Sequence, residues 1–352
     1  MSVIAEDLEA ATSARALQPS RKKTAASCER SSVNNTLANH RRAGELNSSE
    51  SVGTIGALWR FPVKSMLGEE VAEAELSESG IIGDRVYALR DRETGKVASA
   101  KHPKLWPNLF GCRAAFVEPP RPDGEPPPVR IELADGTSVM SDAADADAVL
   151  SRFFGRDVEL ARAARNGYTI DQYHPDEENY DPEGHRDEVV EVGLGAAFFN
   201  ERGLPSAVPE GSFFDLYPLS VLTTSTLEQL GELEPQSRFD ARRFRMNVIV
   251  DTSGHGFVEN EWVGHKLAIG DHVRVAVALP DPRCVMPSLE QEDLPRDPRI
   301  LKALAQHNRI DVAGARYPCA GVYAVAEATG TIQRGDRISL VLSSSTLAGS
   351  TA

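Results

Sequence analysis

The chain has few cysteines and none of the spacings that cysteine-rich sites require. Its 352 residues include only Cys28, Cys112, Cys284 and Cys319, with no Cys-x-x-Cys pair. This scarcity excludes a cysteine-rich zinc module and a plant-type iron–sulfur cluster, and it gives no sign of a disulfide scaffold. We therefore expect a reducing compartment, with the cytoplasm as the location.

Basic residues and long apolar runs are also scarce. Lysine and arginine number 38 against 52 acidic residues, and the net charge of −14 argues against a nucleic-acid partner or an anionic membrane surface. No apolar run approaches the roughly 20 residues that cross a bilayer. The sequence lacks GxGxxG, P-loop, HExxH and GxSxG motifs, and its eight histidines show no metal-ligand spacing. Nucleotide-binding and zinc-hydrolase functions are therefore unsupported.

The first 50 residues lack a core-forming pattern. They are rich in Ser, Ala, Asn, Arg and Glu, with almost no aromatic or β-branched periodicity, and they predict a disordered tail. Basic residues among Ser and Ala are a feature of transit peptides, but Glu6, Asp7 and Glu9 count against that alternative.

The rest of the chain reads as mostly β with some α. Short alternating segments predict a smaller β-rich domain over 53–165 and a second β-rich block over 189–345. Many strands with few helices favour a barrel or a sandwich. The predicted strands include 71–76, 85–89, 129–133, 246–250, 273–279, 321–325 and 337–342. The predicted helices begin at Asp142, at Thr224 or Ser225, and at Asp297-Pro298.

An acidic segment separates the two blocks. Residues 166–191 carry nine carboxylates and a single arginine. We interpret 166–188 as a solvated acidic loop, since such charge runs are usually exposed. A calcium site is the alternative, although Asp176 to Asp181 lacks the ligand register of an EF-hand.

Cys284 is the most informative single residue. It lies in Asp281-Pro282-Arg283-Cys284, just after the alternating strand 273–279. A neighbouring guanidinium favours the thiolate, which attacks electrophiles and binds soft metals. The alternative is a small buried hydrophobe, the commonest fate of a free cysteine, and we expect that role for Cys112 and Cys319.

Four cations occupy similar positions beside predicted strands. They are Lys64, Arg85, Arg245 and Arg283. If the fold gathers them, they form an anion site, because lysine and arginine with hydroxyl or backbone donors hold phosphate in proteins. The alternative is four unrelated surface charges.

Five motifs in order give the chain a resemblance to a known family. They are Trp59-Arg60-Phe61-Pro62-Val63-Lys64-Ser65, Gly83-Asp84-Arg85, Phe244-Arg245-Met246-Asn247, Pro282-Arg283-Cys284 and Gly330-Thr331-Ile332-Gln333-Arg334-Gly335-Asp336. Together they resemble the MOSC proteins (molybdenum cofactor sulfurase C-terminal domain) that carry the MOSC N-terminal β-barrel domain. Bacterial members and the mitochondrial amidoxime-reducing components share this arrangement. The resemblance covers roughly residues 53–342.

The resemblance implies a MOSC β-barrel core over 189–345, a MOSC N-terminal β-barrel-like domain over 53–165, and a molybdenum–pyranopterin cofactor between them. It implies that Cys284 is the thiolate on molybdenum and that Arg283 lies beside it. The implied cofactor contacts are Lys64, Ser65 and Arg85 at the phosphate end, Arg245 and Asn247 at the pterin, and Thr223 and Thr226 near the cofactor.

The implied activity is the reduction of N-hydroxylated or related N–O and S–O compounds. A soft sulfur ligand suits molybdenum held by dithiolene sulfurs and oxo groups. Some bacterial relatives append a plant-type ferredoxin domain. Here the sequence stops about ten residues after the final predicted strand. We therefore expect electrons from a separate ferredoxin-, flavodoxin- or cytochrome b5-like protein, and a small-molecule substrate.

Two alternatives use the same residues differently. In the first, Cys284 carries a persulfide for metal–sulfur cluster or cofactor assembly, since a thiol of low pKa accepts sulfane sulfur. In the second, Lys64 binds pyridoxal phosphate, although no aspartate partner for the pyridine nitrogen is recognisable. After the cysteine, Pro287 and Ser288 replace a Thr-Thr pair of the amidoxime-reducing enzymes, and Ser288 is a candidate substitute for one of those hydroxyls.

Overall fold

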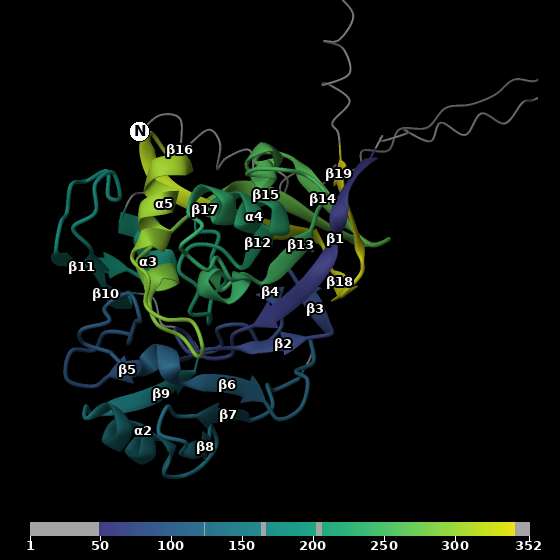
Figure 1. Cartoon of the computed structure of the whole chain (residues 1–352). Coiled ribbons are helices and arrows are strands. Elements are labelled where there is room, and N and C mark those ends of the chain that lie inside the picture. Colours follow the sequence, from purple (N-terminus) through teal and green to yellow (C-terminus); the bar gives the residue numbers. More distant parts are fainter. Residues whose placement is uncertain (1–48, 123, 163–166, 202–205, 342–352) are drawn as a thin grey trace, which may run out of the picture.

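The computed structural model describes residues 49–122, 124–162, 167–201 and 206–341. The described chain is mostly β, as the sequence predicts, and forms two β-rich bodies that lie one above the other in Figure 1. Nearly all of the predicted disordered tail, residues 1–48, lies outside the described residues.

The larger body is a closed β-barrel. Seven strands pair in the order β12-β13-β1-β19-β14-β15-β17, and pairing of β12 with β17 closes the ring. These strands are β1 (Ser49–Arg60), β12 (Leu219–Thr223), β13 (Val248–Asp251), β14 (Lys266–Ile269), β15 (Val273–Pro282), β17 (Ala315–Ala328) and β19 (Arg337–Val341). The pairing of β12 with β13 is parallel, and the other pairings of the ring are antiparallel. The predicted barrel core is therefore confirmed.

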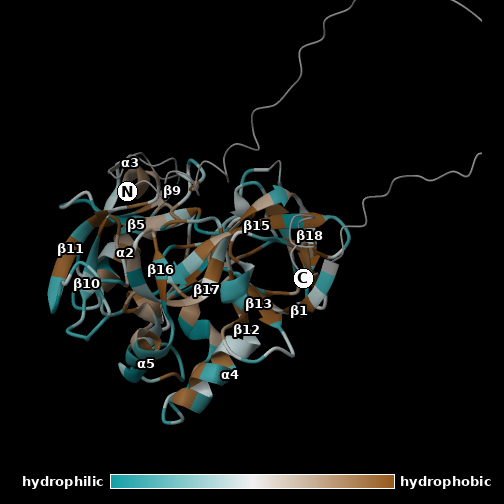
Figure 2. Cartoon of the chain, turned by 90° about the horizontal axis from the view of Figure 1, so that it is seen from above, coloured by the Kyte–Doolittle hydropathy of each residue, from teal (hydrophilic) through white to brown (hydrophobic). Residues whose placement is uncertain are grey.

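Alternation along the strands explains why this sheet curls around a core. In β15, Val273, Val275 and Val277 are buried, while the residues between them are more exposed. Such a period of two directs one face inward. Figure 2 shows the resulting alternation of hydrophobic and hydrophilic residues along the barrel strands. Strand β12 differs, because all five of its residues are buried, which fits a strand covered on both faces.

The first strand of the chain belongs to this barrel. The sequence predicts that residues 53–165 form the N-terminal domain. Strand β1 lies at the start of this range, yet it pairs with the barrel strands β13 and β19. Glycine makes the close approach possible at one point: a Cβ on Gly53 would lie 2.3 Å from the carbonyl oxygen of Asp251. The chain thus enters the barrel, leaves it to build the smaller body, and then returns.

The smaller body contains short sheets around their own hydrophobic core. Its strands are β5 (Tyr87–Asp91), β6 (Arg113–Phe116), β7 (Val129–Glu132), β8 (Ser138–Met140) and β9 (Val158–Arg162), with helix α2 (Ala146–Phe154). Strands β5 and β9 pair with each other, and β6, β7 and β8 form a second sheet. Four short strands lie nearer the barrel: β2 (Glu69–Val71) pairs with β1, and β3 (Glu73–Ser77), β4 (Gly80–Ile81) and β18 (Gly330–Gln333) form a small sheet.

The remaining helices begin close to the predicted positions. Helix α4 (Thr224–Leu233) is capped by Thr223, whose hydroxyl accepts from the Thr226 amide. Helix α5 (Arg299–His307) follows Asp297 and Pro298. The other helical elements and one strand are α3 (Ala196–Glu201), η2 (Leu109–Gly111), η3 (Ala241–Phe244), η4 (Val258–Trp262), η5 (Met286–Ser288) and β16 (Arg309–Val312).

The acidic segment is only partly a loop. Strand β10 (Thr169–His174) pairs with β11 (Glu188–Gly193), so the connection between them is 175–187. Ile170 and His174 are buried on the β10 strand and anchor it. The prediction of a loop over all of 166–188 is therefore wrong for residues 169–174, where an apolar anchor outweighs the surrounding charge. Among the described residues, no helix has the length and apolar character needed to span a membrane.

Candidate functional site

Cys284 lies at the junction of the two bodies, directly after β15. It is partly exposed and free, and it packs against an apolar cluster that includes Ala100 and Phe110 of the smaller body, as does Tyr173 of β10. The strand runs into Pro282, and the Arg283 amide donates to the Pro318 carbonyl at 2.8 Å. The sequence therefore delivers the thiol to the end of a barrel strand, facing the other body.

Lys64 is buried in the same junction with a counter-ion that the sequence did not indicate. Its amine donates to the Phe213 carbonyl at 3.0 Å and pairs with Asp215 Oδ1 at 3.0 Å. Lys101 shares that carboxylate at 2.9 Å. Burial lowers the pKa of Lys64 to about 8, against the attraction of Asp215. These contacts occupy the amine and give no support to the pyridoxal phosphate alternative.

Arg85 and Asn247 meet through one buried carboxylate, Asp84. The Arg85 guanidinium pairs with Asp84 Oδ2, and the Asn247 amide donates to the same oxygen at 2.8 Å. Arg85 also donates to the Arg245 carbonyl at 3.3 Å and lies 4.9 Å from the centre of the Phe61 ring. Residues from 84–85 and from 245–247 are thereby locked together across the junction.

Arg245 extends this group toward Cys284. It is buried, donates to the Met66 carbonyl, and its guanidinium carbon lies 4.3 Å from the centre of the Phe61 ring. Burial and the nearby charge of Arg85 lower the pKa of Arg245 to about 9. The nearby carboxylates Asp84 and Asp215 act in the opposite direction and do not offset the burial.

Arg283 is held by a second buried carboxylate. It pairs with Asp281, which lies beside Tyr323, and it donates to the Phe244 carbonyl. Burial opposes the charge of Arg283, but Asp281 and its neighbours outweigh this, so its pKa is raised. Two buried polar atoms here have no hydrogen-bond partner, Arg283 Nε and Asp281 Oδ1. The group is thus not closed by its own hydrogen bonds.

The backbone is strained where it presents these residues. Ser65, Arg85 and Arg245 have φ angles of 64°, 51° and 56°, in the left-handed region that non-glycine residues rarely adopt. Such conformations persist where the surrounding structure imposes them, and they cluster at functional sites. The Ser65 hydroxyl accepts from the Ala100 amide at 3.1 Å, which leaves its own proton free to be donated.

We define the junction cluster as the buried or partly buried charged side chains around Cys284. Its members are Lys64, Arg85, Lys101, Arg245, Arg283, Asp84, Asp215 and Asp281. Five cations face three carboxylates, which leaves a surplus of two positive charges in a chain of net charge −14. Burying such a surplus is costly unless an anion joins it.

Thr223 and Thr226 do not join this cluster. Ser220 and Asn247 pair near the start of β12, whereas Thr223 is its last residue. The hydroxyls of Thr223 and Thr226 donate to Glu259 Oε2 at 2.6 and 2.7 Å. Their donors are therefore directed at a buried carboxylate at the opposite end of the strand.

Ser288 is also turned inward. Its hydroxyl is buried and donates to the Val285 carbonyl at 2.6 Å within η5. This hydroxyl is therefore directed to the protein backbone and does not act as a free replacement for a threonine at the site.

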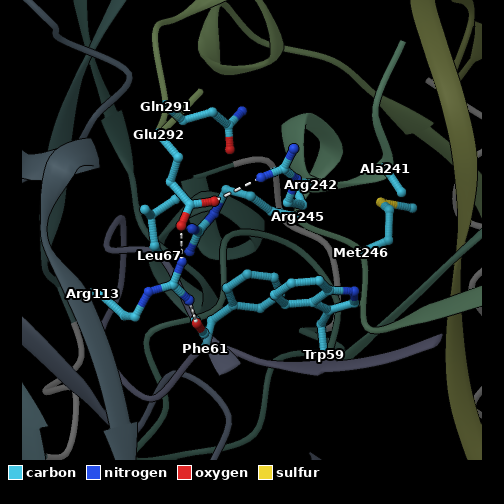
Figure 3. A pocket seen from close by; sticks show the side chains of 11 residues that line it. Trp59, Phe61, Leu67, Arg113, Ala241, Arg242, Arg245, Met246, Gln291 and Glu292 are labelled. Carbon is cyan, nitrogen blue, oxygen red and sulfur yellow. Dashed lines mark hydrogen bonds and ion pairs between the residues drawn. The ribbon is translucent and has the colours of Figure 1, made fainter. Parts of the chain in front are cut away.

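A small hollow adjoins the cluster on the Arg245 side. Figure 3 shows Glu292 between Arg113 and Arg242, next to the stacked rings of Trp59 and Phe61. Glu292 Oε2 is 2.9 Å from the Arg242 guanidinium, and its other oxygen pairs with Arg113. This ion pair joins the two bodies, because Arg113 lies on β6 and Arg242 on η3.

The sequence did not single out the carboxylates of the junction cluster or Lys101. Asp84 lies inside a motif next to Arg85, and Asp281 lies two residues before Arg283, so both could have been found from the sequence. Asp215 and Lys101 carry no local signal, because their relation to Lys64 exists only in the folded chain. The other described cysteines are buried, and burial raises the pKa of Cys112 to about 11 and that of Cys319 to about 12.

Comparisons with known proteins agree with this architecture. The MOSC N-terminal beta barrel domain matches residues 52–156, and the MOSC domain matches residues 210–339. Mitochondrial amidoxime reducing component 2 of Rattus norvegicus is 22% identical over 305 residues, covering 82% of this chain and 83% of that protein. Mitochondrial amidoxime-reducing component 1 of Mus musculus is 23% identical over 314 residues, covering 83% of each chain.

Solved structures include more distant matches. The YuaD protein from Bacillus subtilis aligns with a TM-score of 0.38 at 12% identity, covering 82% of this chain and 95% of that one. YiiM from Geobacillus stearothermophilus aligns with a TM-score of 0.26 at 20% identity, covering 36% of this chain and 54% of that one. On the two domain matches, in the order that the motifs predicted, the chain belongs to the MOSC proteins that carry a MOSC N-terminal β-barrel domain.

Proposed function

We propose that the protein is a molybdenum cofactor-dependent oxidoreductase that reduces N-hydroxylated or related N–O and S–O compounds. Electrons would come from a separate ferredoxin-, flavodoxin- or cytochrome b5-like protein. The observation that carries the proposal is the position of Cys284 beside a buried surplus of positive charge, at the junction of the two matched domains.

The side chains at the junction fit the cofactor on two physical grounds. A pyranopterin cofactor carries a phosphate, and the surplus of two positive charges in the junction cluster needs an anion of that kind. Molybdenum favours a sulfur ligand, and Cys284 supplies a partly exposed thiol. The buried, unpartnered Arg283 Nε and Asp281 Oδ1 offer a further donor and acceptor beside that thiol.

The residues would divide the binding between them. Cys284 would ligate the metal, with Arg283 beside it, and Lys64, Ser65 and Arg85 would hold the phosphate end. Arg245 would contact the pterin, and Asn247 would act mainly by fixing Asp84 and so the orientation of Arg85. Once bound, the molybdenum centre would supply the two-electron redox chemistry that cleaves an N–O bond.

The chain itself would contribute orientation and charge. Strained backbone at Ser65, Arg85 and Arg245 would hold the donors in place before binding, so that little ordering remains to be done when the cofactor arrives. Arg245 and Lys64 would favour bound negative charge, because burial already disfavours their own charged forms.

Metal analysis of the purified chain tests the proposal. Near-stoichiometric molybdenum with pterin, together with reduction of a simple benzamidoxime by an artificial electron donor, is the expected result. Protein free of molybdenum that carries cyanide-labile sulfur would overturn it in favour of the sulfur-carrier alternative, in which Cys284 bears a persulfide.

A further inference from the structure

Three side chains that could bind a metal ion lie at the end of β10 and in the acidic connection that follows it. His174, Asp181 and His185 each offer a ligand atom, and these atoms all lie within 4.8 Å of one another. The sequence shows no metal-ligand spacing among the histidines, and along the chain there is none here. The three residues are too irregularly spaced for a local motif, and the fold of 175–187 brings them together.

The distances are close to those of a metal site. Asp181 Oδ2 is 3.4 Å from His174 Nδ1 and 2.6 Å from His185 Nδ1. Ligands about 2.1 Å from a tetrahedral zinc ion lie about 3.4 Å apart. The His174–Asp181 spacing already meets this value, and His185 needs to withdraw by less than about 1 Å.

Burial and hydrogen bonding point the same way. The side chain of His174 is 10% exposed, and its Nδ1 is a buried polar atom without a hydrogen-bond partner. Nε2 of His174 lies 3.3 Å from the amide nitrogen of Gln172, which in this orientation donates to it and leaves the proton on Nδ1. Metal binding through Nδ1 therefore requires the Gln172 amide to turn over, so that its oxygen accepts from Nε2–H, as outer partners of metal-bound histidines do.

The charge around the three residues favours a cation. Glu183 and Glu188 act on both rings together with Asp181. The side chain of His185 is 25% exposed, so solvent reaches the group from that side.

We propose that His174, Asp181 and His185 form a binding site for a zinc-class divalent transition ion that fastens the 175–187 connection over Cys284. Nitrogen and carboxylate ligands in this number suit such ions and leave the fourth position to water.

The link to Cys284 runs through Tyr180. This residue precedes Asp181, is buried, and its ring centre lies 5.9 Å from that of His174. Tyr173, the residue before His174, packs against the same apolar cluster as Cys284. Burial raises the pKa of Tyr180, and the Cys284 thiol adds to this rise. A metal ion at the three ligands would therefore fix both tyrosines on the Cys284 side of the connection. This inference does not depend on the chemistry proposed for Cys284.

Zinc titration of the full chain tests the site. Because a free thiol also binds zinc, the parent protein is Cys284→Ala, freed of metal with a chelator, and binding is followed by calorimetry with Zn²⁺ and by visible absorption with Co²⁺. We expect one ion per chain and a loss of affinity on the order of 100-fold in His185→Ala. The matched control is His255→Ala, which removes an exposed histidine 3.5 Å from Glu232 and should bind as the parent does.

Two results would overturn the proposal. One is a parent protein that binds no zinc, and the other is His185→Ala or Asp181→Asn binding as tightly as the parent while melting like it. A third measurement tests only whether the metal ion holds the 175–187 connection in place. Zinc should slow amide exchange at 175–187 by about tenfold in the parent and not in His185→Ala, and unchanged exchange in the parent would refute that part.

Discussion

Strand β12 has a buried polar network at each end, and the two networks differ in kind. At its last residue, Thr223 and Thr226 donate to Glu259, whose other oxygen accepts from the Gly321 amide at 3.2 Å. Near its start, Ser220 and Asn247 connect to Asp84 and the surplus cations of the junction cluster. The first network satisfies its members, whereas the second contains strained backbone and unpartnered atoms. A buried network in which every polar group is paired indicates a structural role, whereas a network with unpaired polar groups indicates a place for a ligand.

The largest effect should come from the Cys284 thiol, which lies on the side of the junction cluster. Cys284→Ala should remove molybdenum ligation and abolish reductase activity while the melting temperature changes little, because the side chain is partly exposed. Metal content and turnover of the purified variant measure this. The control is Cys319→Ala, a fully buried packing residue, which should keep activity and lose stability. If the two variants exchanged behaviour, Cys284 would not be the ligand.

The next largest effect should come from Arg85, which contacts the Arg245 carbonyl across the junction. A charge-assisted contact to phosphate contributes on the order of 1.5–3 kcal/mol. Arg85→Ala should therefore weaken cofactor retention by roughly tenfold to a hundredfold, and Arg85→Lys should recover only part, because lysine lacks the planar fork. Cofactor content after dialysis measures this. Wild-type content in both Arg85→Ala and Lys64→Ala would mean that the cluster does not hold the phosphate.

Substitution in the Glu259 network, at the other end of β12, should change the stability of the protein and not its cofactor content. Glu259→Ala leaves two hydroxyls and one amide without their acceptor, at a cost of about 1–3 kcal/mol for each group that stays unsatisfied. Chemical unfolding measures the loss. Cofactor loss in a Glu259→Ala protein that remains folded would show that both ends of β12 serve the ligand, and would return Thr223 and Thr226 to the site.

The same carboxyl predicts a pH dependence. Burial raises the pKa of Glu259 above its ordinary value. A carboxyl whose pKa is higher in the folded state contributes most stability below its unfolded pKa of about 4.5, and that contribution is lost as pH rises through the folded pKa. Unfolding free energies of the wild type and Glu259→Gln, compared from pH 4 to pH 8, should therefore shift in favour of the variant as pH increases. A constant difference over this range would contradict the assignment.

The smallest effect should come from the N-terminal segment. Removal of residues 1–48 should leave cofactor content and activity unchanged, because the sequence there has no core-forming pattern and β1 begins at Ser49. A deletion that continues to residue 54 removes every β1 pair with β19, from Ser49–Val341 to Thr54–Arg337, and should lower the melting temperature. Equal stability of the two truncations would show that this part of the ladder contributes little.

The sequence predicted the strands and helices better than it predicted which strands pair with each other. Alternation identified strands such as 273–279, because this signal lies within a few neighbouring residues. The predicted starts of α4 and α5 were close, but the observed N-caps, Thr223 and Pro298, lie one residue from the predicted ones. Alternation could not place β1 in the barrel, since that pairing joins Thr54 to Asp251. The motifs identified Lys64, Arg85, Arg245, Arg283 and Cys284, which the fold brings together.

The counter-ions of the site were harder to predict from the sequence than its cations. Asp215 is one of 52 acidic residues and has no local feature that distinguishes it, although it pairs with both Lys64 and Lys101. His174 ends β10 and His185 lies in the acidic connection that follows, and only the course of that connection brings the two together. Residue type predicts what a side chain can do, and tertiary contacts decide whether it does so.

The position of β1 has a consequence for synthesis of the chain. Ser51 pairs with Ser339, so the first barrel strand leaves the ribosome long before its last neighbour exists. At about 5–20 residues per second, that wait is roughly 10–60 s. During it, β1 has unpaired edges and the barrel cannot close, so a nascent chain should depend on chaperones until almost all of it is made. For the same reason, a chain cut between the two matched domains would leave the barrel without one of its strands, and the halves would have to be produced together to assemble.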